Sequence, residues 1–254
     1  MTMPLLRRVT IMTLLALVGA GCAGSGDESV DGEVLVSAAA SLTEAFGAIE
    51  IAFEDANPGV DVLLNLASSS SLREQILEGA PVDVFASANT SNMDRVSEAG
   101  AVAGEARIFA ENMLQIAVPA GNPAGVTGLA DFANEGLLIG LCAEDVPCGD
   151  FGRQALDKAG VTPSIDSNEP DVRALLTKIE AGELDAGIVY VTDVISTEGG
   201  VEGVEIPENQ NVVPEYPIAI LLDAPNAEAA ASFVSFVMSD TGQAIMGEYG
   251  FIAP

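Results

Sequence analysis

Short apolar runs alternate with longer segments of helical periodicity along most of this 254-residue chain. The first run, Glu33–Ser37, is typical of a strand, and the segment after it repeats apolar residues at helical spacing, among them Phe46, Ile49 and Phe53. Six further strand-like runs lie at residues 60–66, 82–87, 113–118, 137–141, 185–190 and 216–221. Because helical segments fill most of the gaps between these runs, the sequence predicts an α/β fold.

The N-terminal residues have the layout of an export signal. Arg7 and Arg8 precede an apolar run over residues 9–18, and small residues then lead to Cys22. The apolar run is shorter than the about 20 residues that a membrane-spanning helix needs. We therefore expect residues 1–21 to be a signal peptide.

The end of this signal resembles a bacterial lipobox, in which the cysteine becomes the lipid-modified first residue after cleavage. Residues 17–22 match that pattern except at Gly19, where a larger aliphatic residue is commoner. We expect Cys22 to be lipidated and residues 22–32 to hold this cysteine and a flexible tether rich in glycine, serine and acids. Ordinary signal cleavage and an uncleaved anchor are the alternatives. The predicted location is extracytoplasmic, at the cell membrane.

The charge of the chain excludes one class of partner. Nine Lys and Arg residues against 38 Asp and Glu residues give a formal net charge of −29. Such a surface repels polyanions, so we expect no binding to nucleic acid. The acidity names no partner by itself, because a solvated surface explains it equally well.

Two cysteines remain in the mature chain, Cys142 and Cys148, and there is no histidine. In an oxidising compartment two such cysteines are ordinarily bridged, and over so short a loop a disulfide would mainly shape the loop. A metal site would need more ligands than these two. A disulfide between Cys142 and Cys148 is therefore possible, and the sequence leaves open whether the two are bridged; we expect no cofactor.

Helix-start signals follow several of the predicted strands. The stretches Ser41-Leu-Thr-Glu44 and Ser71-Leu-Arg-Glu74 both fit the S/T-x-x-E capping box, and Pro147 and Pro170 stand before two further helical segments. The free N–H groups and the positive dipole end of a helix favour anions. These junctions are therefore candidate anion-binding points, although a plain helix cap explains each serine equally well.

Seven motifs occur in one order along the mature chain. They are Ala38-Ala-Ala-Ser-Leu42, Ala67-Ser-Ser-Ser-Ser-Leu72, Gly79-Ala-Pro-Val-Asp-Val-Phe-Ala-Ser-Ala88, Asp145-Val-Pro-Cys-Gly149, Asp171-Val-Arg173, Gly187-Ile-Val-Tyr-Val-Thr-Asp193 and the closing Gly242-Gln-Ala-Ile to Tyr249-Gly-Phe251. In this set and order the chain resembles the periplasmic molybdate-binding proteins of ABC importers. The resemblance implies a type II periplasmic-binding-protein fold, in which two α/β lobes flank a ligand cleft.

The resemblance also implies which residues hold the oxyanion, molybdate or tungstate. The family uses two serine hydroxyls, one tyrosine hydroxyl and backbone N–H groups, with no counter-cation. Carried over by motif, these are Ser41, Ser69, Tyr190 and the N–H groups of Cys148 and Val172. Ser70 is an alternative to Ser69 because four serines stand in a row, and Cys148 replaces the alanine usual in the family. Asp83 and Asp193 recur in the motifs, and we interpret them as structural anchors of loops.

The chemistry of the ligand agrees with this set of residues. Molybdate at neutral pH is an unprotonated dianion, so its site needs only donors, whereas a phosphate site benefits from an acceptor for the remaining proton. None of the five positions supplies a carboxylate. Cavity size would exclude sulfate, and the sequence does not separate molybdate from tungstate.

We expect a discontinuous domain I, residues 33–111 plus 216–254, and a domain II, residues 112–215. The two crossovers between them would form a hinge, and the closed, monomeric protein would dock on the ABC permease of the importer. The alternatives are the same fold with another ligand, such as sulfate, thiosulfate or a ferric complex, a structural lipoprotein, or a hydrolase. The absence of histidine excludes a Ser-His triad, and a Ser-Lys pair would need Lys158 or Lys178. Both lysines lie on helical segments whose faces read as solvated, which argues against such a pair. We therefore expect that the protein is not an enzyme.

Overall fold

The computed structural model describes residues 30–254 of the chain. The predicted signal peptide, Cys22 and the first part of the tether lie outside these residues. The strands are β1 Gly32–Ala39, β2 Val60–Ala67, β3 Val84–Ala86, β4 Arg107–Glu111, β5 Leu114–Pro119, β6 Ile139–Cys142, β7 Ser167–Glu169, β8 Ala186–Tyr190, β9 Val201–Glu205 and β10 Glu215–Ile220. The helices are α1 Thr43–Ala56, α2 Ser69–Leu77, α3 Thr90–Glu98, α4 Pro147–Ala159, α5 Val172–Glu180, α6 Val191–Ser196, α7 Ala227–Val237 and α8 Asp240–Glu248, with 3-10 turns η1 Ala40–Leu42 and η2 Leu129–Ala133.

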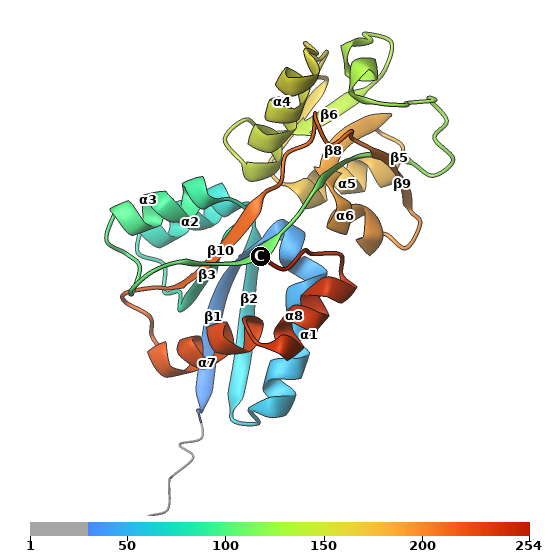
Figure 1. Cartoon of the computed structure of the whole chain (residues 1–254). Coiled ribbons are helices and arrows are strands. Elements are labelled where there is room, and N and C mark those ends of the chain that lie inside the picture. Colours follow the sequence, from blue (N-terminus) through green and yellow to red (C-terminus); the bar gives the residue numbers. More distant parts are fainter. Residues whose placement is uncertain (1–29) are drawn as a thin grey trace, which may run out of the picture.

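The strands form two separate five-stranded sheets. The first has the order β2-β1-β3-β10-β4 and the second the order β7-β6-β8-β5-β9. We call the body around the first sheet lobe I and the body around the second sheet lobe II. Figure 1 shows lobe I with α1, α7 and α8 and lobe II with α4, α5 and α6. The predicted α/β fold is therefore confirmed, as two lobes.

The chain crosses twice between the lobes. It leaves the first sheet after β4 and returns to it in β10, which lies between β3 and β4 and is antiparallel to both. The C-terminal segment closes against the first crossover, because Glu111 and Ile252 exchange backbone hydrogen bonds of 2.7 and 3.0 Å. The C-terminus accordingly lies where the two lobes meet (Figure 1).

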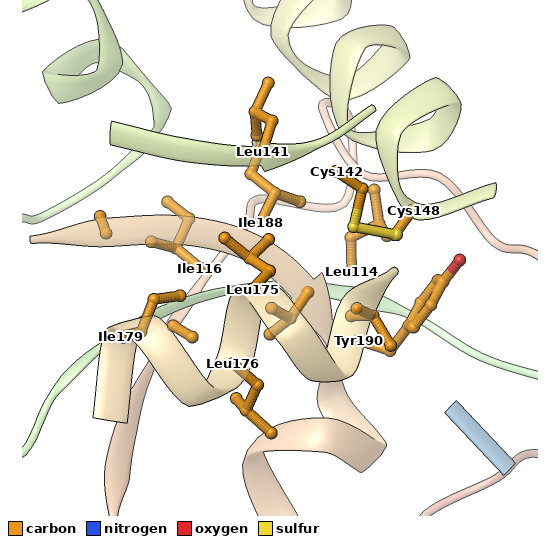
Figure 2. Packing of buried hydrophobic residues seen from close by; sticks show 14 of the residues in the cluster. Leu114, Ile116, Leu141, Cys142, Cys148, Leu175, Leu176, Ile179, Ile188 and Tyr190 are labelled. Carbon is orange, nitrogen blue, oxygen red and sulfur yellow. A yellow bond between two sulfur atoms is a disulfide. The ribbon is translucent and has the colours of Figure 1, made fainter. Parts of the chain in front are cut away.

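The two cores differ in composition. Lobe I is packed around aromatic rings, with Phe46, Phe53 and Phe233 in edge-to-face or tilted contacts whose ring centroids lie 5.4–6.0 Å from each other or from a further phenylalanine. Lobe II is mainly aliphatic, built from the leucines, isoleucines and valines of β5, β6, β8 and α5 (Figure 2). Ala40 of lobe I belongs to the lobe II core cluster, so the turn η1 packs against the other lobe.

All seven strands predicted from apolar runs are present, with bounds that shift by at most two residues at either end. Three further strands were not predicted: β4, β7 and β9. β7 and β9 are short and carry polar or acidic residues, and Gly203 interrupts β9. β7 pairs with β6, and β9 pairs with β5. The local sequence of β7 and β9 does not show these pairings.

Candidate functional site

A small cavity, open to solvent, lies between the two lobes. Lobe I lines it with Ala39, Ala40, Ser41, Ser68, Ser69 and Ala88, and lobe II lines it with Pro147, Asp171, Val172 and Tyr190. The structure thus brings together four of the five predicted ligand residues. The fifth, Cys148, follows Pro147 in α4.

Three helices begin at this cavity. Ser68 and Ser69 are the N-cap and first residue of α2, Pro147 is the first residue of α4, and Val172 is the first residue of α5. The first N–H groups of a helix have no partner inside the helix, and its dipole is positive at that end. Three helix starts around one cavity therefore make it a place for an anion, even in a chain of net charge −29.

Tyr190 ends strand β8 and supplies the most informative atom of the site. Its hydroxyl is buried and, among residues 30–254, is the one buried side-chain nitrogen or oxygen without a hydrogen-bond partner. Figure 2 shows this hydroxyl pointing away from the aliphatic side chains of the lobe II core. Burial raises the pKa of the Tyr190 hydroxyl well above its ordinary value, so the group stays protonated and can donate. An unpaired buried hydroxyl is costly, which is evidence for a missing acceptor in the cavity.

The serine run is divided between two tasks. The Ser69 hydroxyl accepts a hydrogen bond of 2.9 Å from the backbone N–H of Ala88 and faces the cavity. The Ser70 hydroxyl instead donates to the backbone carbonyl of Asp145 in the other lobe. Of the two alternatives left open by the sequence, the structure places Ser69 at the cavity and Ser70 in a contact between lobes.

The two predicted capping boxes are wrong. Helix α1 begins after η1, with Leu42 at its N-cap and no side-chain cap, and the Ser41 hydroxyl lies 3.0 Å from the hydroxyl of Tyr216. In α2 the N-cap is Ser68, which accepts from the N–H of Ser71, so Ser71 lies inside the helix. The S/T-x-x-E pattern is local, whereas the partner of Ser41 lies 175 positions away.

A disulfide holds the lobe II side of the site. The sulfur atoms of Cys142 and Cys148 are bonded, which ties the end of β6 to the first turn of α4. Next to it, Gly149 sits so close to β6 that an added Cβ would lie 1.8 Å from the carbonyl oxygen of Ala143. The turn that carries the N–H of Cys148 is therefore fixed by a covalent bond and by close packing.

Asp193 lies directly behind Tyr190. Its carboxyl group is buried and accepts a hydrogen bond of 2.9 Å from the N–H of Tyr190. Burial raises the pKa of Asp193 to about 7, and this hydrogen bond and the charge of Arg173 oppose the rise. Asp83 in lobe I accepts from the backbone N–H groups of Leu35 and Asn226. Both aspartates therefore hold backbone in place.

Two polar contacts join the lobes beside the cavity. Arg173 of α5 forms an ion pair of 2.8 Å with Glu44 of α1, and Ser70 bonds the Asp145 carbonyl. Asp171, which lines the cavity, caps α5 by accepting from the N–H of Ala174 with its carboxylate. Sequence reasoning had not placed Ser68, Pro147 or Asp171 at the site, although each stands within two residues of a predicted ligand.

Two further properties of the described residues bear on the site. Within residues 30–254 no three His, Cys, Asp or Glu side chains are grouped so as to hold a metal ion. In the same part of the chain, no helix combines the length and the apolar character required to cross a membrane.

The chain is similar to known binding proteins along almost its whole described length. A family model described as bacterial extracellular solute-binding protein matches residues 34–252. The molybdate-binding protein ModA of Mycobacterium tuberculosis is 40% identical over 221 residues, which cover 87% of this chain and 85% of the relative. The putative ABC transporter substrate-binding lipoprotein YvgL of Bacillus subtilis is 29% identical, with 96% of each chain covered.

Two solved structures show the same fold. The periplasmic molybdate-binding protein of Azotobacter vinelandii superposes with a TM-score of 0.77 at 20% identity, covering 87% of this chain and 99% of that chain. The sulfate-binding protein SubI of Mycobacterium tuberculosis superposes with a TM-score of 0.79 at 19% identity and 86% coverage of both chains.

Proposed function

This chain belongs to the bacterial extracellular solute-binding proteins, and on that premise we propose that it captures molybdate outside the cytoplasm for an ABC-type importer. Proteins of this kind bind and deliver a solute and are not enzymes. The observation that carries the proposal is the buried, unpartnered hydroxyl of Tyr190 at a cavity otherwise lined by serines and helix starts. The identity of 40% with a molybdate-binding protein supports the choice of ligand.

The proposed ligand set is the one expected from the sequence: the hydroxyls of Ser41, Ser69 and Tyr190 and the N–H groups of Cys148 and Val172. All five are neutral donors, which suits a dianion that carries no proton of its own. Asp171, which also lines the cavity, uses one carboxylate oxygen to cap α5. Because contacts inside the cavity are not screened by salt, they outweigh the repulsion from a surface of charge −29. The site needs no cofactor, and tungstate, of nearly the same size, fits the same proposal.

Binding would be coupled to closure of the lobes. The ligand set takes Ser41 and Ser69 from lobe I and the other three donors from lobe II, so one anion satisfies both lobes only when they meet. We propose that the two crossovers, near residues 111–112 and 215–216, act as the hinge. The importer permease would then dock on the closed form of a monomer.

We further propose that Cys22 carries a lipid that anchors the mature protein to the membrane. The support is the lipobox-like sequence before Cys22 and the similarity to a lipoprotein of Bacillus subtilis. Mass spectrometry of the protein purified from its membrane fraction would test this, because diacylation adds a fixed mass to a chain that begins at Cys22. An unmodified mature chain would contradict the proposal.

The first test of the ligand is thermal unfolding of residues 31–254 with molybdate, tungstate, sulfate, thiosulfate, phosphate or nitrate, each at the same concentration. A ligand at a hundred times its Kd adds about 2.7 kcal/mol to the free energy of unfolding, which for this size raises Tm by roughly 5 to 10 °C. We expect shifts with molybdate and tungstate alone.

A shift with sulfate instead would keep the cavity and replace the ligand. Sulfate is the second candidate because the fold matches that of a sulfate-binding protein with a TM-score of 0.79. An absence of any shift would contradict the proposed function.

A further inference from the structure

The hydroxyl of Ser41 stands at the end of a chain of hydrogen bonds that starts at the first crossover. Asn112, the residue after β4, is fully buried. Its side-chain nitrogen Nδ2 lies 3.0 Å from Oγ1 of Thr192 and 3.4 Å from the hydroxyl of Tyr216. Tyr216 in turn lies 3.0 Å from Oγ of Ser41.

The direction of this chain is fixed at Asn112. Its side-chain oxygen accepts a hydrogen bond of 2.8 Å from the backbone N–H of Met113, and a backbone N–H can only donate. The amide nitrogen must therefore face Tyr216, whose oxygen accepts from it. With Asn112 donating to it, Tyr216 can give its single proton to Oγ of Ser41, and the proton of Ser41 is then left for the cavity.

The second serine is arranged in the same way by different means. The backbone N–H of Ala88 donates to Oγ of Ser69, so the proton of Ser69 is also free to point into the cavity. The hydroxyl of Tyr190 lies near that of Tyr216 but makes no hydrogen bond of good geometry, so its proton is available to the cavity as well. All three hydroxyls of the site therefore face the ligand as donors. At Ser69 the backbone sets the direction, whereas at Ser41 the side chains of Tyr216 and Asn112 set it.

We propose that Tyr216 and Asn112 are positioning residues that make Ser41 a hydrogen-bond donor toward the anion, and that they thereby favour fully deprotonated oxyanions over protonated ones. The inference rests on the proposed function, because it concerns the same cavity. Neither residue lines the cavity. Each acts through Ser41, and a chain of hydrogen bonds that all run in one direction strengthens the last bond.

The main test is a double-mutant cycle on molybdate affinity with Tyr216→Phe, Ser41→Ala and the two changes combined. Tyr216→Phe removes only the hydroxyl and keeps the ring that packs on Phe109 and Phe251. We expect Tyr216→Phe to weaken binding on the order of tenfold in the wild-type background and less than about twofold in the Ser41→Ala background.

A second variant, Asn112→Asp, reverses the direction of the chain. The carboxylate oxygen accepts from Tyr216, so Ser41 donates to Tyr216 and presents its lone pairs to the ligand. We expect molybdate affinity to fall by about a hundredfold or more. The ratio of molybdate affinity to hydrogen phosphate affinity should fall as well, because a protonated oxyanion can donate to Ser41. Thr192→Val is the control, since it removes the other partner of Asn112 and leaves the chain to Ser41 in place.

The outcomes separate the two proposals. If the wild-type protein binds no oxyanion, the proposed function fails. If the wild-type protein binds molybdate but Tyr216→Phe weakens binding by the same factor with and without Ser41, the inference is overturned and Tyr216 is a structural residue. An affinity ratio that Asn112→Asp leaves unchanged overturns it too, and this variant also decides the question if Tyr216→Phe does not fold.

Discussion

The two lobes supply different chemical groups to the site. Lobe I offers the side chains of Ser41 and Ser69, each hydrogen-bonded to a group of its own lobe, and is packed around aromatic rings. Lobe II offers helix-start N–H groups and the hydroxyl of Tyr190, and holds them with a disulfide and a closely packed glycine. The part of the site that lobe I supplies therefore depends on the type of side chain, whereas the part that lobe II supplies depends mainly on the position of the backbone.

The largest difference between the lobes is expected in the pH dependence of stability, through Asp193 of lobe II. The pKa of Asp193 is about 7 in the folded protein and about 3.9 in an unfolded chain. Between these values the native state holds a proton that the unfolded state has lost. The free energy of unfolding therefore falls as the pH rises from 4 to 7, by roughly 4 kcal/mol for a shift of this size.

Asp193→Asn removes this titration and keeps an oxygen that can accept from the N–H of Tyr190. Chemical denaturation at pH 4 to 8 should show the variant gaining stability relative to wild type as the pH rises. Asp223→Asn, which removes an exposed carboxylate of lobe I, is the control for the change in net charge. Parallel curves for Asp193→Asn and wild type would show that the carboxyl is ionised at low pH.

A pair of glycines tests the role of backbone position. Gly149→Ala in lobe II would place a Cβ 1.8 Å from a backbone oxygen, so we expect a loss of about 3 kcal/mol of stability and of most anion affinity. Gly47→Ala in the middle of α1 meets no atom within 4 Å and should stabilise by about 0.5 to 1 kcal/mol. Thermal unfolding and anion titration of both variants measure this. Equal effects would show that the turn at Gly149 can move.

Removing one ligand hydroxyl from each lobe should weaken anion binding by similar amounts but change the stability of the ligand-free protein in different directions. Ser41→Ala and Tyr190→Phe should each weaken molybdate binding by about 2 kcal/mol, near thirtyfold. Without ligand, Tyr190→Phe should keep or raise Tm because it removes an unpaired buried hydroxyl, whereas Ser41→Ala should lower Tm because it removes the partner of Tyr216. Calorimetric titration and thermal unfolding check both. A lower Tm for ligand-free Tyr190→Phe would mean that its hydroxyl has a partner.

The smallest effect on binding is expected from the disulfide. Replacing Cys142 and Cys148 by alanine should lower the free energy of unfolding by on the order of 2 kcal/mol, because the bond closes only a short loop. We expect a few-fold loss of anion affinity, since packing at Gly149 still holds the turn. Thiol reduction of the wild type should reproduce the change in Tm. Unchanged Tm in the variant would show that the disulfide does not stabilise the folded protein.

The difference between the lobes also explains what the sequence could predict. Apolar runs located seven strands because buried strands carry their signal locally, whereas β7 and β9 depend on pairing with β6 and β5. The resemblance placed Ser41, Ser69, Val172 and Tyr190, and the structure brings all four to one cavity. The ligand role of these residues stays a prediction.

Contacts between distant residues were beyond the reach of local patterns. The spacing around Ser41 fits a capping box. The hydroxyl of Ser41 is instead hydrogen-bonded to Tyr216, which lies 175 residues later in the chain. Asn112 carries no motif, and its importance comes from burial at the crossover. No rule based on sequence spacing identifies such residues, because their contacts depend on the three-dimensional path of the chain.

The position of β10 in the sheet of lobe I has a consequence for the order in which the protein can fold during export. When the chain emerges with its N-terminus first, all strands of lobe II are present once Glu205 has emerged. Lobe I, although it begins first, lacks the strand between β3 and β4 until Ile220 has appeared, and its helices α7 and α8 follow later still. The lobe that is encoded as an insertion can therefore be completed first, and the lobe that surrounds it in sequence is completed around it.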